Sequence, residues 1–141
     1  MSIPVWCLLA FAAWTLLTLV TTIGVYRTRR ILTGRKSFAD YGEYKVEGSP
    51  WYQRAMRAHA NCVENLPVFG AIVLAIVAAG LEGPVLSVLA LVVVCARVPH
   101  TVVHVALEQT NRAVTSRFIL YNIQFLAMSA MVVVIVMRLL S

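Results

Sequence analysis

Four long runs of apolar residues, separated by shorter polar stretches, make up most of the chain. Each run is long enough to cross the hydrocarbon core of a bilayer as a helix, which takes about 20 residues. The pattern predicts an all-α protein with transmembrane helices at residues 3–26, 52–81, 84–107 and 113–137. Because most connections are short, sequential helices are expected to be antiparallel neighbours in an up-and-down, integral membrane four-helix bundle.

The composition supports a membrane protein. Hydrophobic residues make up 60% of the 141 residues and charged residues only 13%, whereas soluble domains have roughly 45–50% and 25%. The length and pattern predict one domain over residues 1–141. The first apolar run has no basic segment before it and no small-residue cleavage site after it, so we interpret it as a retained span rather than a signal peptide.

Basic residues are distributed unequally between the two sides of the predicted bundle. Ten of them flank the side that carries the long loop Arg27–Trp51 and the connection Glu108–Arg112, and Arg138 alone flanks the other. The positive-inside rule therefore predicts a cytoplasmic loop, with both termini outside. The net charge of +6 then reflects topology and attraction to membrane lipid headgroups, and it does not indicate nucleic acid.

Three of the predicted helices carry polar side chains on one face of an otherwise apolar sequence. Spacings of three or four residues align these side chains along each helix. A rise of about 1.5 Å per residue places the three stripes in the cytoplasmic half of the membrane, where charged groups usually mark a functional interior surface. The stripes are Arg57, Asn61 and Glu64 in the second helix, Arg97, His100 and His104 in the third, and Arg117, Tyr121 and Gln124 in the fourth.

Cationic side chains outnumber the one carboxylate among these stripes. Because unpaired charge in a dry site is heavily penalised, the surplus favours an anionic ligand. The alternative is that the groups satisfy one another, for example as a Glu64–Arg97 ion pair between two helices. We predict no metal, because His100 and His104 have no clear third ligand and Arg97 opposes a cation one turn away.

The segment from Arg57 to Pro67 has the spacing Arg-x-x-x-Asn-x-x-Glu-x-x-Pro and leads into an apolar run. It resembles the signature of the MAPEG family, the membrane-associated proteins in eicosanoid and glutathione metabolism. The stretch from Ala96 to His100 resembles the third helix of the microsomal prostaglandin E synthases. The number of spans, the size and the topology agree, so the resemblance covers essentially the whole chain.

The resemblance implies a homotrimer that binds glutathione between neighbouring subunits on the cytoplasmic side. An arginine at the start of the fourth helix would activate the thiol: Arg112 fits by its spacing and its Arg-x-Val-Thr context, and Arg117 is the rival placement. Glu64 would meet the amino group of glutathione. The glutathione-binding residues are expected to be Arg30, Arg57, His59, Asn61, Glu64, Arg97, His100, His104, Tyr121 and Gln124. Arg30 is one choice among Arg27, Arg29 and Arg30.

Elementary chemistry is consistent with this assignment. Arginine forks match the two carboxylates of glutathione, and a guanidinium beside a thiol of pKa about 8.5 favours the thiolate. We expect a glutathione transferase, with peroxidase or isomerase activity as variants, acting on lipophilic electrophiles or lipid hydroperoxides that arrive through the bilayer. The reactive sulfur is then the ligand's and not that of Cys62. Two hypotheses stay open beside it: a non-catalytic lipid- or glutathione-binding helper protein, and a small transporter or channel gated by Glu64.

Overall fold

The computed structural model describes residues 2–41 and 48–141, and its regular structure is helical throughout these ranges. Lys45 and the acidic residues Glu43 and Glu47 of the basic loop lie outside the described residues. The elements in chain order are α1 (Ile3–Thr18), the π-helical segment η1 (Leu19–Gly24), α2 (Val25–Leu32), the short 3-10 turn η2 (Phe38–Tyr41), α3 (Pro50–Ala78), α4 (Pro84–Ala106) and α5 (Asn111–Leu140).

Four helices are long and apolar enough to cross a membrane, which confirms the predicted all-α, multi-pass class. The first of them joins α1, η1 and α2 into one helix over Ile3–Leu32, so it continues beyond the expected end at residue 26. α5 begins at Asn111 rather than at residue 113, because the Thr110 side chain caps it by accepting from the Ala113 backbone N–H at 3.2 Å.

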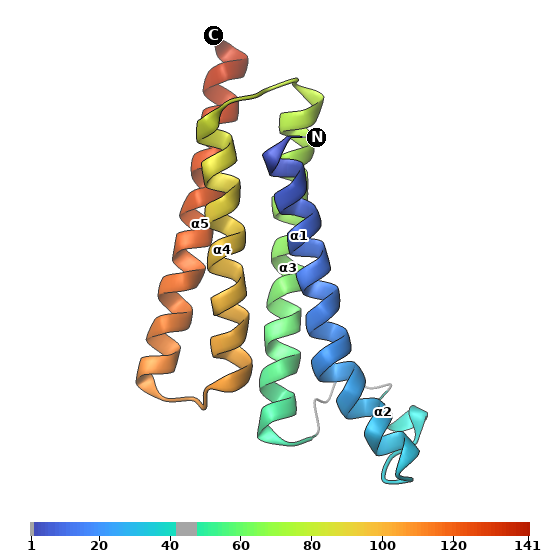
Figure 1. Ribbon diagram of the computed structural model, residues 1–141. Helices are drawn as coiled ribbons and strands as arrows, with labels where there is room; N and C mark the ends of the chain where they lie inside the picture. Colours follow the sequence, from blue (N-terminus) through green and yellow to red (C-terminus); the bar gives the residue numbers. More distant parts are fainter. Residues whose placement is uncertain (1, 42–47) are drawn as a thin grey trace.

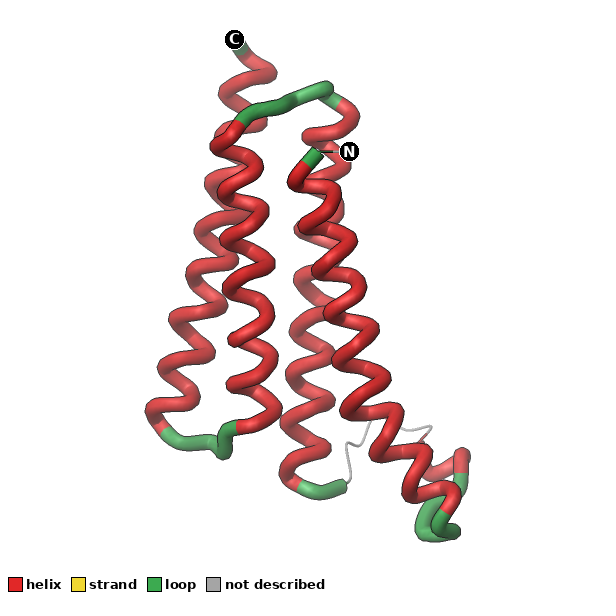
Figure 2. The backbone as a smooth tube through the Cα atoms, viewed as in Figure 1, coloured by secondary structure: helices red, strands yellow, loops and turns green. Residues whose placement is uncertain are grey.

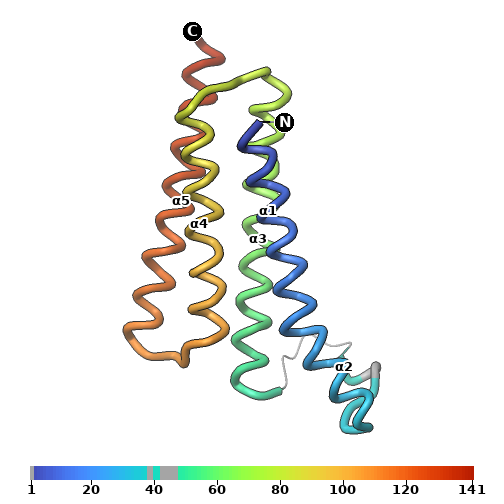
Figure 3. The backbone as a smooth tube through the Cα atoms, viewed as in Figure 1, coloured from blue at the N-terminus to red at the C-terminus, as the bar shows by residue number. Residues whose placement is uncertain are grey.

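The chain runs up and down through the bundle (Figure 1), with both chain ends at one end of the molecule. We call this the terminal end, and the opposite end, which carries the α2–α3 connection and the turn Leu107–Thr110, the loop end. Figure 2 shows that the non-helical segments are confined to these two ends. α4 contacts α1, α3 and α5, and the colouring by residue number shows α4 and α5 side by side (Figure 3).

The core and the outer surface of the bundle are both apolar. Its interior between the helices contains Phe11, Phe69, Val93 and Met131, all fully buried. Large apolar side chains are also exposed on every long helix, as expected for surfaces that face lipid rather than water. Polar groups are therefore the informative exceptions in this fold.

At the terminal end, the α3–α4 turn is closed by an arginine from α5. Nη1 of Arg138 donates to the backbone oxygen of Glu82. The next residue, Gly83, has φ 142° and ψ 160°, a conformation that is essentially restricted to glycine. A Cβ added at Gly83 would lie 3.1 Å from Nη2 of Arg138, so besides the strained backbone the Arg138 guanidinium would have to shift by a few tenths of an ångström.

Gly83→Ala is expected to lower the free energy of unfolding by about 1–3 kcal/mol, because alanine is strained in this backbone region. The control is Gly70→Ala within α3, where the added Cβ would meet only Leu8 Cδ1 at 3.7 Å and alanine favours the helix by about 0.5–1 kcal/mol. Thermal unfolding in detergent measures both. Equal stability of the two variants would contradict the role given to Gly83.

Candidate functional site

A buried arginine joins three helices in the loop half of the bundle. Arg97 of α4 is 0% exposed. Its Nη1 donates to Asn61 Oδ1 of α3 at 2.5 Å and lies 3.5 Å from His100 Nδ1 on its own helix. Its guanidinium carbon also lies 4.9 Å from the ring centroid of Phe11 in α1, within range of a cation–π contact. Arg97 therefore links α1, α3 and α4.

The guanidinium of Arg97 has no carboxylate partner among the residues that the structure describes. Its Nε and Nη2 make no hydrogen bond there. Glu64, the proposed alternative partner, is exposed on α3 and forms no ion pair within the described ranges. The Glu64–Arg97 pair considered from the sequence is thus not formed. The sequence placed both residues at one depth, but it did not show that Phe11 and Asn61 enclose Arg97 within the bundle.

Two histidines continue the polar stripe of α4 toward the loop end. His100 is buried, His104 is half-buried, and their rings meet edge to face at 5.0 Å between centroids. His104 Nδ1 has no hydrogen-bond partner in the described part of the chain. Asn61, Arg97, His100 and His104 thus form one connected set of polar groups, which we call the polar cluster. Of the expected site residues, these are the four that the structure joins to one another by hydrogen bonds or ring contact.

The charged members of the α3 stripe lie outside this cluster, on the exposed side of the helix. Arg57 and Glu64 are exposed, and Asn61 between them is half-buried. Asn61 therefore links the polar cluster to the exposed stripe. His59 leaves the stripe altogether, since it lies against the backbone of Thr15 in α1.

The two rival arginines of α5 have different surroundings. Arg112 is exposed in the first turn of the helix. Arg117 is buried, and its Nη2 donates to the backbone oxygens of Leu107 at 2.9 Å and Val103 at 3.3 Å, at the end of α4. Of the two, Arg112 is the one open to a ligand.

The remaining residues of the α5 stripe do not join the polar cluster through hydrogen bonds. Gln124 is buried and donates to the Leu120 backbone oxygen of its own helix. Its Oε1 has no partner among the described residues. Tyr121 is exposed. Neither residue is hydrogen-bonded to Arg97 among the described residues, although Tyr121 lies near enough to act on it electrostatically.

Arg30 belongs to a separate aromatic cluster at the loop end. Its Nη1 donates to the Tyr26 hydroxyl at 2.6 Å, and Tyr26 stacks on Tyr52 with 4.2 Å between ring centroids. Arg27 donates to the Tyr52 hydroxyl at 2.8 Å. These contacts explain why the first helix continues to Leu32: Arg27 and Tyr26 are held against Tyr52 of α3, and Arg30 binds Tyr26 one turn away on its own helix.

Three contacts of the site had no sequence signal that pointed to them. Phe11 lies in a uniformly apolar run, so its contact with Arg97 was not foreseen. Cys62 is fully buried and its Sγ lies 3.5 Å from Thr101 Oγ1 of α4, away from the exposed stripe. Arg54 donates through Nε to the Val105 backbone oxygen at 3.4 Å. The sequence shows Arg54 only as one of the basic residues beside the long loop, which does not indicate this contact.

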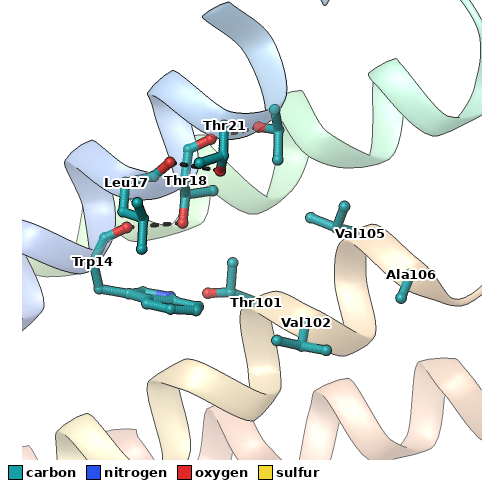
Figure 4. Close-up of a pocket in the computed structure, with 9 residues that line it drawn as sticks. Trp14, Leu17, Thr18, Thr21, Thr101, Val102, Val105 and Ala106 are labelled. Atoms are coloured by element: carbon teal, nitrogen blue, oxygen red, sulfur yellow. Dashed lines mark hydrogen bonds between the residues drawn. The ribbon is translucent and has the colours of Figure 1, made fainter. Parts of the chain in front are cut away.

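Two of the cavities in the loop half of the bundle lie beside elements of the site. A polar cavity of about 350 Å³ opens at the loop end beside the start of α3. An apolar crevice of about 240 Å³ lies between the first helix and α4, with Trp14 facing Thr101 across it (Figure 4). The polar cavity is lined by Pro50, Gln53, Arg54, Arg57, Glu108 and Gln109.

The fold and site define a class: a multi-pass helical membrane protein with a buried arginine–histidine cluster in one half of the bundle. The chain belongs to the MAPEG family, whose model matches residues 4–137, and the resemblance drawn from the sequence is thereby confirmed. No curated protein and no solved structure matches the chain.

Asn61→Leu is expected to destabilise the ligand-free protein by about 1.5–3 kcal/mol, because it removes the side-chain oxygen that accepts from the buried Arg97 guanidinium. Asn65→Leu is the matched control, since Asn65 donates only to the Asn61 backbone oxygen within its own helix. Denaturation in detergent compares the two. A loss of stability no larger for Asn61→Leu than for Asn65→Leu would show that the Arg97–Asn61 bond contributes little.

Proposed function

We propose that the protein is a glutathione-dependent membrane transferase or peroxidase that acts on lipophilic electrophiles or lipid hydroperoxides. The observation that carries the proposal is the exposed stripe of α3. Arg57 and Glu64 are exposed on a membrane-spanning helix, and Asn61 between them is held by a buried arginine. Together with membership of the MAPEG family, this stripe supports a site for a zwitterionic peptide with two carboxylates.

The stripe also supports a homotrimer with the ligand between subunits. Glu64 is surrounded along α3 by exposed apolar residues such as Val63 and Val68. A charged carboxylate left against lipid at this depth costs several kcal/mol. A neighbouring copy of the chain and a bound glutathione would cover it, with the glutathione amino group as its counter-charge.

In the proposed site the α3 stripe and the polar cluster have different tasks. Arg57, Asn61 and Glu64 contact glutathione directly. Arg97 is enclosed in its own subunit, so it acts by orienting the Asn61 amide, and His100 supports Arg97 from the same helix. His104 is half-buried at the loop side of the cluster and is the histidine placed to meet the ligand.

Arg112 is the proposed thiol activator, because it is the exposed arginine at the start of α5. A guanidinium beside the glutathione sulfur stabilises the thiolate. In the transferase reaction, the thiolate forms a carbon–sulfur bond to the electrophile and the leaving group departs with the electron pair. With a hydroperoxide, the sulfur attacks the terminal oxygen and releases an alcohol. A second glutathione then converts the sulfenic acid to disulfide and water.

Binding of glutathione to the purified protein is expected to produce thiolate ultraviolet absorbance near neutral pH. Arg112→Gln should remove most of it, because the bound thiol then returns toward its ordinary pKa of about 8.5. Cys62→Ser is the matched control and should keep both the absorbance and turnover of a chlorinated nitrobenzene.

The result that contradicts the catalytic proposal is thiolate absorbance that is absent in the wild-type protein or unchanged in Arg112→Gln. Glutathione binding without turnover of either a chlorinated nitrobenzene or a lipid hydroperoxide would favour the helper-protein alternative. Solute flux into proteoliposomes that requires Glu64 and is unaffected by glutathione would favour the hypothesis of a transporter or channel.

Glu64→Gln is expected to weaken glutathione binding about tenfold or more, because the amino group loses its charged partner. The variant should bind a glutathione analogue that lacks the amino group about as well as the wild-type protein does. Equilibrium binding of both ligands to both proteins measures this. An equal loss of affinity for the two ligands would show that Glu64 does not meet the amino group.

A further inference from the structure

The carboxyl end of α4 is held by arginines from two other helices. Arg117 of α5 donates through Nη2 to the backbone oxygens of Val103 and Leu107, at 3.3 and 2.9 Å. Arg54 of α3 donates through Nε to the backbone oxygen of Val105 at 3.4 Å. The last carbonyls of a helix lack partners within the helix and carry its partial negative charge. Two guanidinium groups therefore bind three backbone oxygens at this end of α4, one of which, that of Val103, also accepts from the Leu107 N–H. We call this arrangement the arginine clamp.

Arg117 is committed to this clamp. Its side chain is 7% exposed, so the guanidinium is shielded from solvent and faces the backbone oxygens at the end of α4. The charged groups that act on it are Arg57 and Arg54, both of the same sign. The favourable contacts of its guanidinium are thus with backbone carbonyls. A residue bound in this way has little freedom to meet the sulfur of a ligand.

The clamp bridges the turn Leu107–Thr110, which leads directly into the start of α5 and Arg112. Arg117 reaches back from the second helical turn of α5 to Leu107, the first residue of this connection. Within it, the Thr110 N–H donates to the Glu108 backbone oxygen at 2.8 Å, and the Thr110 oxygen accepts from the Val114 N–H at 3.0 Å. The start of α5 is therefore fixed from both sides, by the Thr110 cap and by the contact of Arg117 with α4.

We propose that Arg117 is a positioning residue that, together with Arg54, fixes the turn Leu107–Thr110 and thereby the place of Arg112. Its catalytic consequence rests on the proposed function, in which Arg112 activates the thiol. Arg117 then acts only through Arg112 and is not a second activator. Misplacing a catalytic group by about 1 Å can lower the rate about 100-fold. Loss of the clamp is therefore expected to slow the reaction by displacing Arg112, although Arg117 does not touch the substrate.

A double-mutant cycle of Arg112→Gln and Arg117→Gln tests this directly. Arg117→Gln is expected to lower kcat about 10- to 100-fold, with the glutathione Kd changed less than about threefold, since the α3 stripe is untouched. Arg117→Lys keeps a cation that can donate to the carbonyls and should recover part of the rate. The double variant should be no slower than Arg112→Gln alone, within about twofold. Effects that multiply in the double variant would overturn the proposal, because they require Arg117 to act independently of Arg112.

Amide hydrogen exchange in the ligand-free protein is a second test of the clamp, and it does not depend on enzymatic activity. Arg117→Gln should speed exchange at Leu107, Thr110 and Val114 by about tenfold or more. Arg138→Gln is the matched control, because it removes an arginine–carbonyl bond at the terminal end and should leave these amides unchanged. Unchanged exchange in Arg117→Gln overturns the clamp whatever the activity. Faster exchange in a protein without glutathione turnover would support the clamp and contradict the proposed function alone.

Discussion

The hydrogen bond from the buried Arg97 guanidinium to the Asn61 side chain is the contact on which the rest of the site depends. A fully enclosed cation inside a membrane-spanning bundle must be compensated, and here neutral groups do so in place of a carboxylate: an amide oxygen, a histidine ring and the face of Phe11. These partners come from α1, α3 and α4, so one side chain determines how three helices meet. Asn61 is in turn the point at which this buried set reaches the exposed face of α3.

Arginine has a second structural use at each end of the bundle. Arg138 binds the carbonyl of Glu82 at the terminal end, and Arg117 and Arg54 bind the carbonyls at the end of α4 at the loop end. Backbone oxygens at helix ends near a membrane have few alternative partners, so a guanidinium satisfies them and joins two helices at once. The excess of basic residues that suggested an anionic ligand therefore divides into two groups. Arg97, Arg117 and Arg54 form hydrogen bonds within the chain, whereas the exposed Arg57 and Arg112 remain open to a ligand.

Much of this organisation could be predicted from the order of residues. Long, mainly apolar runs predicted the four long helices, and the spacing of Arg97, His100 and His104 placed them on one face of α4. The continuation of the first helix to Leu32 was missed, because charged residues normally end a span and the contacts of Arg27 and Tyr26 with Tyr52 of α3 are tertiary. The enclosure of Arg97 and the binding of Arg117 to α4 were missed for the same reason. Helical periodicity gives the direction of a side chain from its own helix but not what the neighbouring helix presents to it.

The central claim is that the exposed stripe of α3, held in place by the buried arginine behind it, receives glutathione. The most direct measurement is a structure of the protein in lipid nanodiscs with glutathione bound. The account predicts glutathione against Arg57, Asn61 and Glu64, with its sulfur beside an Arg112 guanidinium and a second copy of the chain closing the site. A stripe that faces lipid with nothing bound, or glutathione seated at another part of the surface, would contradict it.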